Sequence, residues 1–121
     1  MALTVTERFT TADYAASSEL MGGIVVVSCL IDFDSSYPTG GEALADTDFS
    51  ANTQASARNS TILHVICGPT DHATVNAHVV WDNTNKKLIL YLVGADGSTK
   101  AEAGDTTDQS AHSVECLVFL N

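Results

Sequence analysis

The chain has 121 residues, 15 of them acidic and 5 of them Lys or Arg, so its formal net charge is −10. Such a surface repels the phosphate backbone, and the basic residues are dispersed except for Lys86-Lys87, so we expect no nucleic-acid partner. The longest apolar run, Ile24 to Ile31, is shorter than the roughly 20 residues of a membrane-spanning helix, so we expect no membrane partner. The length fits one domain, residues 1–121.

The N-terminal residues MALTVTERFT lack the basic segment followed by an apolar segment that marks a secretory signal, so we expect synthesis in the cytoplasm. Residues Leu3 to Phe9 predict a weak strand. Thr10 to Leu20 predicts about two helical turns, with Thr11 as a candidate N-cap. We expect residues 1–20 to form an N-terminal arm.

The segment from Gly23 to Phe33 predicts a central strand. Its apolar residues alternate onto one face, and further apolar residues lie on part of the other face, so we expect this strand to be covered on both sides. The first face holds Val25, Val27, Cys29, Ile31 and Phe33, and the second holds Ile24, Val26 and Leu30.

Two later segments repeat the period of two. Ile62 to Cys67 predicts a strand that ends at Gly68-Pro69, because proline donates no backbone hydrogen bond. Thr74 to Asp82 predicts a strand with one wet face. Its core face holds Val75, Ala77, Val79 and Trp81.

The residues Asp82 to Asn85 predict a tight turn, because their short polar side chains bond their own backbone. A hairpin partner follows at Lys87 to Val93. The last strand is expected from about Ser113 to Leu120, with Val114, Cys116, Val118 and Leu120 on the core face.

Two stretches, residues 51–60 and 96–111, are dominated by Ala, Ser, Thr, Gly, Asn and Asp and cannot form a core of their own. We interpret them as surface loops or arms, of the kind that order against a neighbour. Leu44 to Phe49 predicts a single helical turn. The pattern as a whole predicts an all-β protein, an antiparallel sandwich or barrel of Greek-key or jelly-roll type, with at most one or two short helical turns.

No pattern of catalytic or metal-binding residues stands out. The four histidines lack the spacing of a zinc site, although His72 and His78 could share a sheet face. Asp32 and Asp34 lie on one strand face and leave a calcium site as an alternative. Neither a GxSxG elbow nor a phosphate-binding glycine loop occurs. We therefore expect a non-enzymatic protein without a cofactor or a metal.

The three cysteines each lie inside an apolar run, where a thiol behaves as a small hydrophobic group. They are Cys29, Cys67 and Cys116, and an odd, scattered set does not indicate a disulfide framework. We expect all three to pack in the core.

The segment YPTGGEALADTDF, with the residues just before it, predicts a structural corner between two sheets. Hydroxyl and carboxylate groups can cap a turn, proline presets one dihedral angle, and a glycine pair permits positive φ and close backbone approach. The residues of this corner are Asp34, Tyr37, Pro38, Gly40, Gly41 and Glu42. A ligand site explains fewer of these residues than a corner does.

Three segments resemble small virion structural proteins of tailed bacteriophages, including phages of cyanobacteria. They are IDFDSSYPTGGEAL (31–44), WDNTNKKLILYL (81–92) and GDTTDQSAHSVECLVFL (104–120). The resemblance implies a capsid decoration, or cement, protein on the outer capsid surface. Its implied partners are the major capsid protein and two further copies of itself in a homotrimer. The acidic composition agrees with a position away from packaged DNA.

A second hypothesis uses the same fold as a tail-associated or carbohydrate-binding module. Tyr37, Trp81 or Tyr91 would then supply a stacking platform for sugar rings. Trp81 shares its strand face with apolar residues, which favours a core position over an exposed one.

Overall fold

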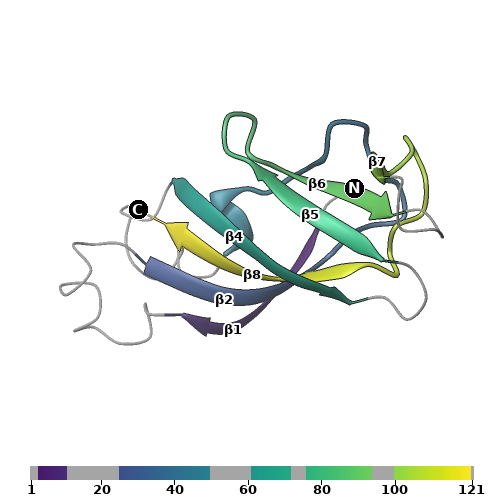
Figure 1. Cartoon of the computed structure of the whole chain (residues 1–121). Helices are drawn as coiled ribbons and strands as arrows, with labels where there is room; N and C mark the ends of the chain where they lie inside the picture. Colours follow the sequence, from purple (N-terminus) through teal and green to yellow (C-terminus); the bar gives the residue numbers. More distant parts are fainter. Residues whose placement is uncertain (1–2, 11–24, 50–60, 72–75, 94–99, 121) are drawn as a thin grey trace.

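The structure is a computed structural model, which describes residues 3–10, 25–49, 61–71, 76–93 and 100–120. In this part of the chain the strands form two antiparallel sheets (Figure 1), as the period of two predicts. The first sheet has the strand order β1-β2-β8-β4. Its strands are β1 (Thr4–Thr10), β2 (Val25–Asp32), β8 (Ser113–Leu120) and β4 (Ile62–Asp71).

The second sheet has the strand order β3-β6-β5, and β7 also pairs with β6. Its strands are β3 (Glu42–Ala43), β6 (Lys87–Val93), β5 (Ala77–Asp82) and β7 (Lys100–Glu102). The two sheets enclose the core as a sandwich and do not join into a closed barrel. Because β8 lies between β2 and β4, strands far apart in sequence are neighbours, which a chain of simple hairpins would not give.

The core forms where the predicted apolar faces meet. Val27, Cys29 and Ile31 of β2 are fully buried, and their neighbours across the strand boundary are Val118, Cys116 and Val114 of β8. Leu88 and Leu90 of β6 are also fully buried. The core faces predicted for β2 and β8 are confirmed at these positions. Burial of such side chains contributes roughly 1.5–3 kcal/mol each.

The prediction that β2 is central is confirmed, since β1 and β8 flank it. The prediction that it is covered on both sides is wrong for the described part of the chain. Val26 and Leu30, which point away from the core, are only half-buried. No described element packs over that face of the sheet, whereas the second sheet covers the opposite face.

The expected end of a strand at Gly68-Pro69 is also wrong. β4 runs on to Asp71, and the pairing register with β8 shifts between Cys67 and Thr70. A β-bulge therefore absorbs the proline, which is tolerated because β4 lies at the edge of its sheet. β5 begins at Ala77 instead of Thr74, and residues 72–75 lie outside the described part.

The β5–β6 hairpin forms at the predicted turn. The Asp82 carboxylate accepts hydrogen bonds from the backbone N–H groups of Thr84 (3.0 Å) and Asn85 (3.1 Å). A hydrogen bond from the Asn85 side chain, reinforced by these two backbone bonds, holds the pKa of Asp82 below its usual value. Lys86 then takes a positive φ of 57° and returns the chain to β6.

Helical structure in the described residues is limited to one 3-10 turn, Asp46–Asp48, at the place where a single turn is predicted. Leu44 and Phe49, on either side of it, are buried as expected. No helix among the described residues has the length and apolar character to span a membrane. The helical turns predicted within 10–20 and the arm residues 11–20 lie outside the described part, whereas β1 pairs with β2 along Thr4–Thr10.

Candidate functional site

The corner segment crosses from the first sheet to the second, between the end of β2 and the start of β3. It begins at Phe33, whose backbone N–H donates to the His112 carbonyl (3.1 Å). Asp34 follows, and its carboxylate accepts the Ser36 N–H at 2.6 Å, which forms a local turn. The polar residues at the end of the strand therefore bond to the backbone that they follow.

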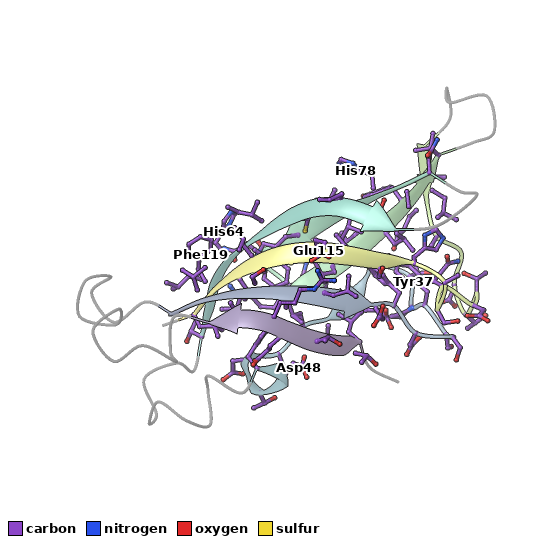
Figure 2. All side chains as sticks on the ribbon, turned by 90° about the horizontal axis from the view of Figure 1, so that it is seen from below. Tyr37, Asp48, His64, His78, Glu115 and Phe119 are labelled. Atoms are coloured by element: carbon purple, nitrogen blue, oxygen red, sulfur yellow. The ribbon has the colours of Figure 1, made fainter. Side chains whose placement is uncertain are left out.

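Tyr37 is the centre of the corner, with an exposed fraction of 0%. Its hydroxyl donates to the Glu102 carboxylate (3.0 Å) and accepts the backbone N–H of Leu90 (3.0 Å). Its backbone pairs with Thr107 in an isolated bridge, and its ring lies 6.2 Å from the ring of Phe33. Burial is the main cause that raises the pKa of Tyr37. Figure 2 shows Tyr37 at the end of the sandwich opposite Phe119.

The two glycines make the turn that follows. The Gly41 N–H donates to the Pro38 carbonyl (3.1 Å), and Gly40 has a φ of 91°, as a type II turn requires at its third residue. Gly41 has a φ of 100°, and a Cβ there would lie 2.7 Å from the Leu88 carbonyl oxygen. Gly40 has open space instead. Pro38 is exposed. Only Gly41 is therefore required for close approach to β6.

Glu42 ends the corner as the first residue of β3 and has an exposed fraction of 2%. One of its carboxylate oxygens accepts the Asp34 backbone N–H at 3.4 Å. Its other oxygen, Oε1, and Oδ2 of Asp34 are buried and have no hydrogen-bond partner among the described residues. Burial, reinforced by the Asp34 charge, raises the pKa of Glu42 to about 7.

The six residues predicted for the corner thus fall into four places. Asp34 and Glu42 meet at the start of the second sheet, while Tyr37 and Gly40 meet at Glu102, whose carboxylate also accepts the Gly40 N–H (2.6 Å). Gly41 lies against β6, and Pro38 faces solvent.

The sequence did not reveal Glu102, which lies in the stretch 96–111 interpreted as a loop or arm. That interpretation is wrong for residues 100–102, which form β7, whereas residues 103–111 are a mostly exposed loop. Glu102 of β7 and Thr106, Thr107 and Gln109 of the loop contact the corner. The Gln109 N–H donates to the Asp34 carbonyl (3.0 Å). The alternation Lys100-Ala101-Glu102-Ala103 was the available signal, and it is too short to predict a strand. Residues 51–60 and 96–99 lie outside the described part.

The rings of Tyr37, Trp81 and Tyr91, each proposed as a stacking platform for sugar rings, lie in three different places. Tyr37 is fully buried, and Trp81 packs against the core, as its strand face predicts. The Trp81 ring N–H donates to Asn83 (3.2 Å). Tyr91 pairs with His78 on the opposite face of the second sheet. The three rings therefore have no common surface.

The histidines and the acidic pairs do not come together at one site either. His64 lies on the outer side of β4 beside Phe119, and His78 lies on β5, far from it in Figure 2. His112 is buried near the corner, and His72 lies outside the described residues. Within the described ranges, no group of three or more His, Cys, Asp or Glu side chains is arranged to hold a metal ion. Asp32 and Asp34, which were the alternative calcium site, therefore have no third His, Cys, Asp or Glu ligand among the described residues.

The three cysteines form a row that the sequence did not predict. Cys116 of β8 is paired in register with Cys29 of β2 on one side and with Cys67 of β4 on the other. Cys29 and Cys116 are buried as expected, whereas Cys67 is half-buried. Burial, with the charge of Glu7, raises the pKa of Cys29 to about 12. A hydrogen bond with Cys67 and burial raise the pKa of Cys116, so the thiols of Cys29 and Cys116 pack as neutral groups.

Two open hollows lie on the surface of the described part. One, of about 300 Å³, lies beside Leu44, Ile62 and Lys86. The Lys86 ammonium is already used in the fold, since it donates to the Ile62 carbonyl (3.0 Å) and to Asn83 (2.9 Å). The other, of about 230 Å³, lies on the outer side of the first sheet between Ile66 and Leu117.

Comparison of the chain with protein-family models, with curated proteins and with solved structures finds no match. The chain is an antiparallel two-sheet protein. Its corner segment forms hydrogen bonds that hold the fold together.

Proposed function

We propose that this chain is a capsid decoration, or cement, protein of a tailed bacteriophage. It is made in the host cytoplasm, binds the outer surface of the capsid through the major capsid protein, associates with itself as a homotrimer and stabilises the shell. The observation that carries the proposal is the resemblance of the segment 31–44, with its glycine pair, to virion structural proteins of such phages.

The structure supports this proposal because the segment 31–44 forms hydrogen bonds to the protein's own strands. Tyr37, Gly40 and Glu102 bond to one another and to the strands around them. A segment that fixes the angle between two sheets suits a rigid structural protein. Such a protein acts by binding its partners over a broad surface and not by catalysing a reaction at one site. Many copies that each bury roughly 800 Å² per partner can stabilise a shell in this way.

Purified virions of the phage that encodes the chain provide the test. Mass spectrometry would count the copies per particle, and electron microscopy would locate them. We expect copies in the hundreds on the outer capsid surface. A handful of copies at the tail would contradict the proposal and favour the tail-associated or carbohydrate-binding module instead.

A second measurement tests the effect on the shell. Particles that lack the chain should release their DNA at a lower temperature than particles to which the purified protein has been added back. Analytical ultracentrifugation of the protein alone should give three copies per complex at micromolar concentration. A clean monomer at that concentration would argue against the homotrimer.

A further inference from the structure

The three cysteines lie on neighbouring strands at one level of the first sheet. β2, β8 and β4 run side by side in that order (Figure 1), and Cys29, Cys116 and Cys67 are in register across them. All three are free thiols. Cys116, on the middle strand, therefore has another thiol directly opposite it on either side.

The register between β4 and β8 meets the geometric requirement of a disulfide bond. Residues directly opposite each other on antiparallel strands have Cα atoms about 4.5–5.5 Å apart and side chains on the same face of the sheet. A disulfide needs Cα atoms about 4.4–6.8 Å apart. Cys67 and Cys116 are such a pair, and both side chains pack against the core. They can be joined with little movement of the backbone.

Cys116 also lies opposite Cys29, so its choice of partner needs a reason. The hydrogen bond between Cys67 and Cys116 is the main cause that lowers the pKa of the Cys67 thiol. Burial has the opposite effect on Cys29, whose pKa it raises to about 12. Because the thiolate is the attacking form in disulfide chemistry, Cys67 is the more reactive of the two neighbours of Cys116.

The position of Cys67 in the sheet also makes it the accessible thiol. β4 lies at the edge of the first sheet, whereas β2 lies between β1 and β8. Cys67 is half-buried, and Cys29 is fully buried. The pairing of β4 with β8 shifts directly after Cys67, at Gly68-Pro69, and a β-bulge of this kind interrupts the regular ladder. Of the three thiols, Cys67 is therefore the one that a small dissolved oxidant can reach.

We infer that Cys67 and Cys116 form a reversible disulfide bond when the folded chain meets a disulfide oxidant such as oxidised glutathione. The Cys67 thiolate attacks one sulfur of oxidised glutathione and releases the first glutathione thiolate. The Cys116 sulfur then attacks the Cys67 sulfur and releases the second. Two electrons pass from the cysteine pair to the oxidant, and the two thiol protons end on the two glutathione molecules. Cys29 remains a free thiol.

The bond would join strands that are far apart in the sequence. A cross-link between Cys67 and Cys116 closes a loop of about 50 residues, which stabilises the fold mainly by restricting the unfolded chain. The inference goes beyond the proposed function and does not depend on it. In a chain made in a cytoplasm that keeps thiols reduced, the bond would form only after the chain leaves the cell.

Tryptic digestion distinguishes the possible pairings, because each cysteine falls in a different peptide. Cleavage after Arg and Lys places Cys29 in 9–58, Cys67 in 59–86 and Cys116 in 101–121. The folded full-length chain is incubated with oxidised glutathione, the remaining thiols are blocked with N-ethylmaleimide in urea, and the peptides are identified by mass spectrometry. We expect 59–86 linked to 101–121 within one chain, 9–58 carrying the blocking group, and loss of the link after dithiothreitol.

Single alanine variants identify the pair independently, with circular dichroism to show that each is folded. Cys29→Ala is the matched control and should keep the link, whereas Cys67→Ala and Cys116→Ala should lose it. Oxidation should raise the thermal midpoint of the wild type and of Cys29→Ala by about 5–15 °C at one fixed protein concentration. It should leave the midpoints of Cys67→Ala and Cys116→Ala unchanged.

Several results would overturn the inference. They are free thiols at both Cys67 and Cys116 after oxidation of the folded chain, a lasting mixed disulfide of Cys67 with glutathione, a link from Cys116 to Cys29, and a link between two chains. A link that forms only in urea, or a rise in midpoint that Cys67→Ala shares with the wild type, also overturns it. The proposed function is decided separately by the copy number and position of the chain in virions.

Discussion

Two regions of the molecule depart from the usual distribution of polar and apolar residues. In the corner between β2 and β3 polar residues are buried, and on the outer face of the first sheet, the side away from the core, apolar residues are exposed. The corner is rich in Asp, Ser, Tyr, Gly and Glu, yet Tyr37 and Glu42 are almost completely buried there. The outer face is apolar, yet Ile66 and Leu117 are exposed.

The difference teaches that the burial of the Tyr37 hydroxyl at the corner is compensated by hydrogen bonds, whereas exposure on the face leaves apolar area uncovered. A buried polar group is retained where partners satisfy it, as Glu102 and the Leu90 N–H satisfy Tyr37. An exposed apolar group has no such constraint and remains available for a partner. The corner should therefore control stability.

The largest effect is expected at Tyr37. Tyr37→Ala removes a fully buried ring and should lower the free energy of unfolding by about 3–5 kcal/mol. Tyr37→Phe keeps the ring but leaves the Leu90 N–H without its acceptor, at a cost of about 1–3 kcal/mol. Urea titration at one fixed protein concentration measures both values. Equal stability of Tyr37→Phe and the wild type would show that the hydroxyl bonds contribute nothing.

The buried Glu42 carboxyl should make stability depend on pH. Its pKa is raised from 4.5 to about 7 in the folded chain, so the folded state binds more protons than the unfolded state between these values. The contribution is fully present below pH 4.5 and is lost as the pH rises through 7. Its loss amounts to at most about 3 kcal/mol.

Glu42→Gln is the control for this pH dependence, because it keeps the shape of the side chain and removes its proton equilibrium. The difference in unfolding free energy between the wild type and Glu42→Gln should shift between pH 4.5 and pH 8. Parallel pH profiles for the two proteins would mean that Glu42 ionises normally in the fold.

The two adjacent glycines give a smaller and more selective effect. Both have positive φ, so alanine is strained at either position, but only at Gly41 would its Cβ meet the Leu88 carbonyl oxygen, at 2.7 Å. Gly41→Ala should therefore destabilise the chain by about 1–3 kcal/mol more than Gly40→Ala. The two thermal midpoints measure this difference, and a larger loss for Gly40→Ala would contradict the close packing against β6.

The sequence alone determined the longer strands and the core faces of β2, β5 and β8, because alternation of side chains along a strand is a local property. It did not predict the short strands β3 and β7 or the end of β4. The six residues of the corner were predicted for the same reason, since proline and glycine act on their own backbone angles. Tertiary structure alone decided which strands are neighbours. It placed Glu102 against Tyr37 across 65 positions, aligned Cys29, Cys116 and Cys67, and left Ile66 and Leu117 uncovered. Such pairings depend on register between distant segments, and no local pattern encodes that register.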